Sequence, residues 1–246
     1  MTITADNLSC AYDERAYLTQ LSFHVTSHLS ILGANGAGKS MLARTLCGLL
    51  PYQGSLKLHH SELQTLSSGA IAKTLSYIPA KLELFDRYTT VEEFALLGRY
   101  PYKDPYRTYT QSDREDVNSV LMQLKLDTLK QHPVTQLSSG QQQLLLIAQA
   151  LIQNTTIMIF DEPTANLDPH NTLKFARLFR HLQTRHTTIL ITHDLALAAY
   201  VKGSALFLHD HTASFYEDVN TFLDTDTLAR CYRATFHPQT KALLYE

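Results

Sequence analysis

The fold of this chain is decided by the stretch Gly33-Ala34-Asn35-Gly36-Ala37-Gly38-Lys39-Ser40. It fits the pattern G-x-x-x-x-G-K-[ST], which is typical of a loop that binds the phosphates of a nucleotide. Glycines let the backbone pass close to phosphate oxygens, so that successive N–H groups point toward them. We expect the Lys39 ammonium to reach the β- and γ-phosphates and the Ser40 hydroxyl to bind Mg²⁺.

The residues on both sides of this loop support that interpretation. Leu29 to Leu32 form a short apolar run, which predicts a buried strand entering the loop. Residues 41–50 predict a helix that leaves the loop and is stopped by Pro51 and Gly54. The positive end of the helix dipole then faces the loop and favours phosphate. The alternative is a glycine-rich turn without a ligand, which would need neither the strand nor the helix.

The composition is that of an ordinary globular protein of 246 residues, with 44% hydrophobic and 18% charged residues. This length allows one large domain or one domain with a subdomain. A net charge of -2 gives no indication of nucleic acid or an anionic membrane as a partner. Cys10, Cys47 and Cys231 form neither a disulfide framework nor a zinc pattern. We expect no signal peptide and no membrane-spanning segment, because the apolar runs are short.

The pattern of residues changes twice along the chain. Residues 1–31 favour strands, residues 85–155 favour helices, and strands and helices alternate from residue 156 onward. That alternation predicts a parallel sheet with helices on both faces. Two helix starts, at residues 90–93 and 112–115, have the spacing of a capping box. The other predicted strands are residues 2–4, 18–25, 55–59, 74–78, 156–160 and 188–191, and the other predicted helices are residues 171–183 and 195–200.

A pair of carboxylates follows one of these strands. Residues 157–160 are Ile-Met-Ile-Phe, and Asp161 and Glu162 come directly after them. Open α/β sheets bind ligands at the carboxyl ends of their strands. Asp161 can hold Mg²⁺ directly or through water, and Glu162 can polarise the attacking water as a general base. The alternative is a surface Asp-Glu pair that caps a helix.

A third motif, Leu-Ser-Ser-Gly-Gln-Gln-Gln at residues 137–143, precedes a helix rich in Leu, Ile and Ala. Taken alone, it is a helix start with serine caps. Three other motifs accompany it and the phosphate loop: Ile-Met-Ile-Phe-Asp-Glu-Pro at 157–163, Asn-Leu-Asp at 166–168 and Ile-Thr-His-Asp at 191–194. In this order and spacing the set resembles the ATP-binding subunit of an ABC transporter, whose signature, Leu-Ser-Gly-Gly-Gln, differs from Leu-Ser-Ser-Gly-Gln by one residue.

The resemblance implies an α/β fold: a P-loop NTPase (RecA-like) core with a mainly parallel sheet, an N-terminal antiparallel β subdomain and an inserted α-helical subdomain. It implies a single ABC ATPase domain over residues 1–246. Residues 1–84 and 156–246 would form the nucleotide-binding core, and residues 85–155 would form the helical subdomain that carries the signature motif. The implied cofactors are ATP and Mg²⁺.

The resemblance also assigns roles to individual residues. Two subunits would pack head to tail, so that the signature residues of one face the γ-phosphate held by Lys39 of the other. Glu162, His193 and Lys39 form the implied catalytic set, in which His193 hydrogen-bonds the γ-phosphate. Ser40 and Asp161 would hold the metal. The implied nucleotide-binding residues are Tyr12, Gly33, Asn35, Gly36, Ala37, Gly38, Lys39, Ser40, Met41, Ser139, Gly140, Gln141 and Asp168.

Two of these assignments come with particular reasons. Tyr12 matches the aromatic residue that stacks on adenine, although an ordinary strand aromatic is the alternative. Asp168 resembles the acidic residue of the loop that bridges the two nucleotide sites.

Three positions depart from the family pattern. Ala80 stands where the family has a glutamine that contacts Mg²⁺ and the attacking water, so we expect slower hydrolysis or altered coupling. Met41 replaces a common threonine and removes one hydroxyl near the phosphates. Ser139 replaces the first glycine of the signature pair.

Residues 97–102, Leu-Gly-Arg-Tyr-Pro-Tyr, resemble the importer branch that serves iron-siderophore, haem and cobalamin permeases. The implied partners are a second ATPase subunit in a homodimer, transmembrane permease subunits and, indirectly, a periplasmic or extracellular substrate-binding protein, with no nucleic acid. The permease would hold the protein at the cytoplasmic face of the inner membrane. Iron chelate is the expected cargo, and cobalamin, zinc and manganese stay open.

In that branch the segment around residues 81–102 forms a surface cleft for a coupling helix of the permease. Tyr88, Tyr100 and Tyr102 suit such an interface, or else are solvated tyrosines of a loop.

Two other functions stay open at this point. A nucleotide-gated regulatory module, which binds ATP with negligible turnover, would tolerate Ala80, although Glu162 and His193 argue for turnover. A soluble ABC ATPase of DNA repair or translation would need a second nucleotide domain, coiled coils or basic arms, for which the chain has neither room nor charge. The twelve histidines include His209 and His211, which would share a strand face, and are interpreted as dispersed surface residues rather than a metal site.

Overall fold

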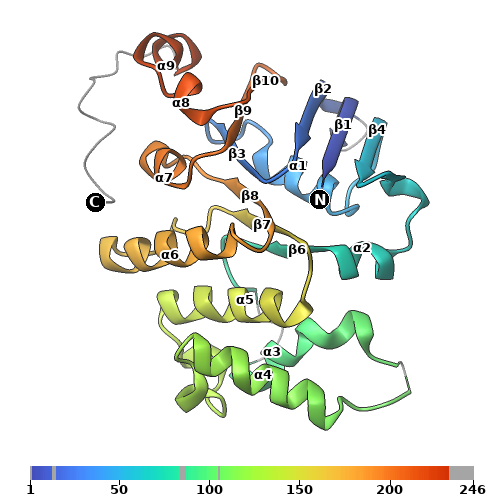
Figure 1. Cartoon of the computed structure of the whole chain (residues 1–246), viewed down its shortest axis with the longest axis vertical. Coiled ribbons are helices and arrows are strands. Elements are labelled where there is room, and N and C mark those ends of the chain that lie inside the picture. The colour runs from blue at the N-terminus through green and yellow to red at the C-terminus, as the bar shows by residue number, and fades with distance from the viewer. Residues whose placement is uncertain (1, 13–14, 84–86, 105, 233–246) are drawn as a thin grey trace.

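Two sheets organise the computed structural model, which describes residues 2–12, 15–83, 87–104 and 106–232 (Figure 1). The larger sheet has the strand order β10-β9-β3-β8-β7-β6, and the smaller sheet has the order β2-β1-β4-β5. The predicted α/β class, with a mainly parallel sheet and an N-terminal antiparallel β subdomain, is confirmed.

The larger sheet carries the phosphate loop and is parallel except at one edge. Its strands are β3 (His28–Gly33), β6 (Leu75–Ile78), β7 (Ile157–Asp161), β8 (Thr187–Ile191), β9 (Ser204–His209) and β10 (Thr212–Tyr216). Only β10 runs antiparallel, as a hairpin with β9. All residues of β3, β7 and β8 are buried, because both faces of this sheet are covered.

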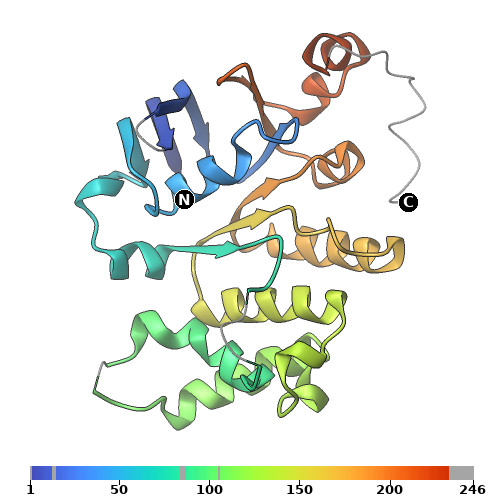
Figure 2. The same cartoon turned by 180° about the vertical axis from the view of Figure 1, so that it is seen from behind.

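One face of the larger sheet packs against the smaller sheet and helix α1 (Lys39–Leu46) (Figures 1 and 2). The smaller sheet consists of β1 (Ile3–Tyr12), β2 (Arg15–Val25), β4 (Tyr52–Leu58) and β5 (Ser61–Glu62). Ile157 and Ile159 of β7 point to this face, whereas Met158 and Phe160 point to the other. This alternation is the ordinary pleat of a strand that is buried on both sides.

Helices cover the opposite face of the larger sheet. They are α5 (Ser139–Gln153), α6 (Pro169–Leu182) and α7 (Leu195–Val201), and α3 (Val91–Leu96) and α4 (Gln111–Gln123) pack on α5. Short helices α8 (Val219–Phe222) and α9 (Thr225–Tyr232) close a third cluster against β9. The remaining helical elements are α2 (Ser68–Thr74) and the 3₁₀ turns η1 (Leu63–Thr65), η2 (Leu97–Tyr102), η3 (Asp127–Leu129) and η4 (Val134–Gln136).

Two of the helix boundaries that differ from the prediction have a clear local cause. The helix after the phosphate loop ends at Leu46, before Pro51, because Gly48 adopts a left-handed φ of 70° that cannot continue a helix. The capping box at residues 90–93 is confirmed. The box expected at 112–115 instead starts at Thr110, whose hydroxyl accepts a hydrogen bond from the N–H of Asp113.

The prediction for His209 and His211 was wrong. His209 is the last residue of β9, whereas His211 lies in the turn to β10 with a left-handed φ of 65°, so the two do not share a strand face. Within the described residues no group of three or more His, Cys, Asp or Glu side chains could hold a metal ion.

The contact of η2 with α5 provides a test of this packing. Gly98 is buried, and a Cβ there would overlap the carbonyl oxygen of Gln149 on α5. We expect Gly98→Ala to lower the free energy of unfolding by about 1–3 kcal/mol, because the backbones must separate.

Gly69 offers a matched control, since it lies in α2 and a Cβ there meets nothing within 4 Å. Gly69→Ala should leave stability unchanged or raise it by up to about 1 kcal/mol. Denaturant unfolding of both variants checks this, and equal midpoints would contradict the packing described.

Candidate nucleotide-binding site

The phosphate loop joins β3 to α1, as the sequence predicts. Gly38, which precedes the first turn of α1, has a φ of 93°. The left-handed φ favours glycine, and a Cβ on Gly38 would crowd the ring of Tyr17 and Leu18, at 3.1 Å from each. The loop therefore ends where the unpaired N–H groups of a helix begin, which is a favourable place for an anion.

The side chain of Lys39 is buried and folded back over its own loop. Its Nζ donates to the carbonyl oxygens of Gly33, at 2.9 Å, and Ala34, at 3.1 Å. A pocket of about 400 Å³ adjoins it. The residues that line this pocket are Tyr17, Asn35, Gly36, Gly38, Lys39, Ser40, Met41 and Glu162.

Glu162 connects the other two residues of the predicted catalytic set. Its Oε1 lies 3.7 Å from Nζ of Lys39, and its Oε2 accepts from Nδ1 of His193 at 2.8 Å. Glu162 has a left-handed φ of 47°, which is uncommon for a residue with a side chain. The structure thus brings Lys39, Glu162 and His193 together at the carboxyl ends of β3, β7 and β8.

Asp161 is the buried last residue of β7, and its two carboxylate oxygens differ. Oδ2 accepts from the hydroxyl of Tyr77 at 2.8 Å. Oδ1 has no hydrogen-bond partner in the described part of the chain. Burial, and secondly the charge of Asp161, raises the pKa of Tyr77, so its hydroxyl keeps the proton that it donates.

The signature residues lie far from this pocket in the fold, because α5 and α1 cover opposite faces of the larger sheet (Figure 1). Ser138 caps α5 in a capping box with Gln141. Asp168 caps α6, and the N–H of Asn171 holds the pKa of Asp168 below its ordinary value. Ser139, Gly140, Gln141 and Asp168 are not among the residues that line the phosphate pocket.

Tyr17 is a pocket residue that the sequence analysis missed. Its hydroxyl donates to the carbonyl oxygen of Gly36, and its ring lies edge-on to the ring of His211, with centroids 5.1 Å apart. The role of Tyr17 becomes visible only in the structure, where its ring lies against Gly38. In the sequence it is one more tyrosine of a segment that favours strands, and no motif marks it as a pocket residue. Tyr12, the tyrosine predicted to stack on adenine, ends β1, and its side chain lies outside the described residues.

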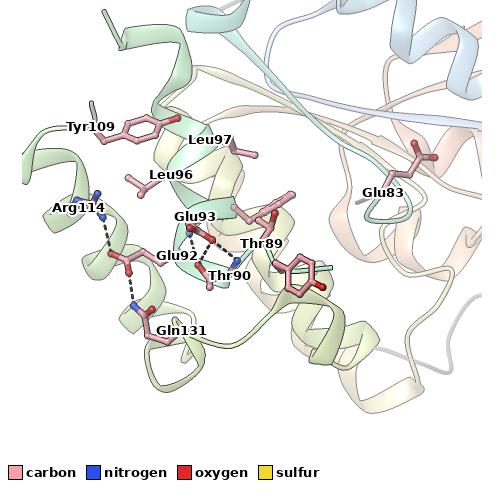
Figure 3. Close-up of a pocket in the computed structure, with 12 residues that line it drawn as sticks. Glu83, Thr89, Thr90, Glu92, Glu93, Leu96, Leu97, Tyr109, Arg114 and Gln131 are labelled. Atoms are coloured by element: carbon pink, nitrogen blue, oxygen red, sulfur yellow. Dashed lines mark hydrogen bonds and ion pairs between the residues drawn. The ribbon is translucent and has the colours of Figure 1, made fainter. Parts of the chain in front are cut away.

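A second hollow, of about 1070 Å³, lies in the helical region away from the phosphate loop (Figure 3). Its lining residues include Tyr88 and Leu97, which are exposed, and Tyr109. Figure 3 shows Glu92 held between Arg114, at 3.6 Å, and Gln131, at 2.8 Å. Tyr100 and Tyr102 are exposed but are not among the lining residues.

Tyr102 interacts with other residues of its own chain. Its ring is covered by the guanidinium of Arg99, whose Cζ lies 4.7 Å from the ring centroid, and Tyr102 donates to the carbonyl oxygen of Gln153. Tyr102 is therefore fixed on the protein surface by its own chain.

Ala80 lies at a small cavity of about 30 Å³, beside Ser139 and Gln143. The side chain of Gln143 is buried, and its Nε2 has no hydrogen-bond partner among the described residues. Within that same part of the chain, no helix combines the length and the apolar character needed to cross a membrane.

The phosphate loop between a parallel strand and a helix, with Asp161 and Glu162 at the neighbouring strand end, defines a P-loop nucleotide-binding protein. Comparison with known sequences identifies the particular family. The profile described as ABC transporter matches residues 18–165, which is more than half of the chain, so this chain belongs to the ABC transporter family. Accordingly it is an ATP-binding subunit of the ABC ATPase type.

Relatives agree with this assignment. The achromobactin transport ATP-binding protein CbrD of Dickeya dadantii is 33% identical over 216 residues, which cover 86% of this chain and 80% of that protein. The protein of Helicobacter pylori strain 26695 named "Probable iron chelatin transport ATP-binding protein" is 32% identical and covers 85% of this chain and 84% of its own length.

A solved ABC transporter in an inward-facing conformation shares the fold, with a TM-score of 0.84 at 24% identity, over 95% of this chain and 90% of that one. ATPase subunits of this family work with transmembrane permease components.

Proposed function

We propose that this chain is the ATP-hydrolysing subunit that energises an importer of iron chelates. The observation that carries the proposal is the meeting of Lys39, Glu162 and His193 beside the phosphate loop. A cation for the γ-phosphate, a carboxylate for the attacking water and a hydrogen-bonding histidine together suit phosphoryl transfer to water. The names of the relatives support an iron chelate as cargo.

Mg²⁺ fits the residues at the end of β7. The buried Oδ1 of Asp161 lacks a partner, and hard oxygen ligands of this kind suit Mg²⁺. Ser40, on the phosphate loop, would supply the second ligand. When bound, Mg²⁺ neutralises charge on the phosphates.

Each residue of the loop then has a defined task. Lys39 exchanges the carbonyl oxygens of its own loop for phosphate oxygens. The N–H groups of residues 33–41 surround the phosphates, and Tyr12 stacks on the base. Glu162, held by His193, orients the water that attacks the γ-phosphorus.

Two copies of the chain would complete each nucleotide site. The signature residues Ser139, Gly140 and Gln141 stand at the start of α5, where the positive end of the helix dipole attracts a phosphate. No residue of this turn lines the phosphate pocket of the same chain. A head-to-tail homodimer supplies this turn from the other copy, and Asp168 lies in the loop between the two sites.

The hollow between α3, α4 and the loop at Glu83 would receive a coupling helix of the permease. It is open, it is lined by both apolar and acidic side chains, and Tyr88 and Leu97 stand exposed at it. Residues 85–155 would act as a helical subdomain on the core formed by residues 1–84 and 156–246, and the predicted junction at 84–85 lies outside the described residues. The permease would hold the subunit at the cytoplasmic face of the inner membrane, with a substrate-binding protein delivering the cargo on the far side.

Glu162→Gln tests the enzymatic role. We expect phosphate release in the assembled transporter to fall by about 10²–10⁴-fold, because the amide cannot accept a proton from water. Affinity for ATP should persist, since Lys39 and the loop are unchanged.

Glu217→Gln, at an exposed position between β10 and α8, is the matched control and should keep the wild-type rate. Equal, near-zero rates for wild type and Glu162→Gln would favour a nucleotide-gated module instead.

Ala80→Gln tests the departure from the family. A glutamine at this position can contact the metal and the attacking water, so we expect the variant to hydrolyse ATP faster than wild type in the assembled transporter. Lys81→Gln is the control, because it adds the same side chain one residue later. An unchanged rate for Ala80→Gln would show that alanine does not limit turnover.

Uptake by cells that lack this gene tests the cargo. Loss of the subunit should abolish accumulation of a radiolabelled ferric siderophore and leave manganese uptake unchanged. The wild-type gene should restore iron uptake, and the Glu162→Gln gene should not. Loss of manganese uptake with iron uptake intact would contradict the proposed cargo.

A further inference from the structure

In the described part of the chain, only one of the two carboxylate oxygens of Asp161 accepts a hydrogen bond. Asp161 is 4% exposed, so its oxygens cannot rely on bulk water for hydrogen bonds. Oδ2 accepts from the Tyr77 hydroxyl, whereas Oδ1 has no partner in the described part of the chain. A buried carboxylate oxygen without a donor is unfavourable, which points to a ligand that the protein chain does not supply.

The position of Tyr77 follows from the pairing of β6 with β7. Tyr77 lies opposite Ile159, and both side chains belong to the cluster on the α1 face of the sheet. Asp161 is two residues after Ile159, so its side chain points to the same face. The phenol is long enough to run along this face and to meet the carboxylate at the end of the neighbouring strand.

The hydroxyl of Tyr77 also interacts with α1. The side chain of Arg44, which lies one helical turn after Ser40, is near enough to the Tyr77 hydroxyl to lower its pKa in opposition to burial. A hydroxyl can donate one hydrogen bond and accept others, so Tyr77 can give its proton to Asp161 and accept from Arg44. The phenol thus lies between the helix that follows the phosphate loop and the strand that carries Asp161.

This arrangement leaves one carboxylate oxygen free. An arginine in direct contact would pair with both oxygens of a carboxylate, as guanidinium groups commonly do. No ion pair joins Arg44 to Asp161 within the described residues. A phenol offers a single donor and occupies Oδ2 alone.

We propose that Tyr77 is a positioning residue for the metal site: its hydroxyl fixes Oδ2 of Asp161 so that Oδ1 is presented to the Mg²⁺ of the bound nucleotide. The inference rests on the proposed function of the site. Ala80, three residues along the chain, supplies no polar group, so the orientation of Asp161 carries more of the metal binding.

Tyr77→Phe removes the hydroxyl and keeps the ring. The experiment measures binding of a fluorescent, non-hydrolysable ATP analogue to the full chain, first in EDTA and then as Mg²⁺ is added. We expect the half-saturating Mg²⁺ concentration to rise about tenfold, as for the loss of one hydrogen bond to a buried charge. Affinity in EDTA should stay within about twofold of wild type, because the phosphate loop is intact.

Tyr52→Phe is the matched control. Tyr52 lies on β4, and its hydroxyl also donates to a carboxylate, Oε1 of Glu62, at 3.2 Å. This variant should leave both the Mg²⁺ requirement and the affinity in EDTA unchanged. A thermal unfolding midpoint for each variant separates a change in the metal site from a loss of folded protein.

A double-mutant cycle with Asp161→Asn gives the second measurement. If Tyr77 acts through Asp161, then Tyr77→Phe should have no further effect on the Mg²⁺ requirement in the Asp161→Asn background. A Tyr77→Phe effect that persists in the Asp161→Asn background would overturn the inference. It would also be overturned if Tyr77→Phe alone left the Mg²⁺ requirement unchanged, or if it lowered the affinity for the ATP analogue as much in EDTA as in Mg²⁺. A wild-type chain without any Mg²⁺-dependent affinity would overturn the proposed function as well, whereas the other outcomes leave that function standing.

Discussion

The hydrogen-bonded ladder of β3, β8 and β7 is the constraint on which the site depends. Ile31 pairs with Ile191, and Asp161 pairs with Ile191 from the other side, so β7 and β8 end at one level and β3 continues two residues further, to Gly33. Two further backbone bonds extend the ladder past the strand ends: the N–H of Glu162 donates to Ile191 at 2.9 Å, and the N–H of Thr192 donates to Ile31 at 3.2 Å. The phosphate loop, the carboxylate pair and the histidine segment therefore leave the sheet side by side, although the loop and His193 are separated by most of the chain. A slip of one residue in this register would move Asp161 to the opposite face of the sheet.

Much of this could be predicted from the sequence because the signals are local. Apolar runs such as residues 157–160 predict buried strands, and the phosphate-loop motif and the Asp161-Glu162 pair indicate the chemistry expected at strand ends. The missed features depend on contacts between distant segments. Tyr17 matters because Gly38 lies against its ring, and Tyr77 matters because β6 pairs with β7; neither tyrosine has a distinctive sequence environment. The sequence did not predict the cap at Thr110, because two overlapping segments, 110–113 and 112–115, both have the spacing of a capping box. The hydrogen bonds between Thr110 and Asp113 show that the first of them forms the box.

Lys39 and Glu162 both have partners within the site, whereas Oδ1 of Asp161 has none in the described part of the chain. Lys39 donates to two carbonyl oxygens of its own loop and faces Glu162, which in turn accepts from His193. A triphosphate that enters the pocket must replace these partners. Its binding would therefore exchange one set of hydrogen bonds for another, rather than add bonds to a lysine that had none. If Lys39 binds the triphosphate, as proposed, the same exchange would free Glu162 from Lys39 and would couple nucleotide binding to the availability of the proposed general base.

The geometry of one chain also limits what that chain can do alone. Helix α5, with the signature turn at its start, packs on the face of the sheet opposite to α1, and the intervening strands are fully buried. No rearrangement short of unfolding that sheet could carry the signature turn to the phosphate pocket of its own chain. If the signature turn contacts a γ-phosphate, as proposed, the contact is made between two chains, and nucleotide binding and dimer closure are one equilibrium. Removing the γ-phosphate by hydrolysis would then weaken the interface directly, because the group that joins the two chains is the group that is lost.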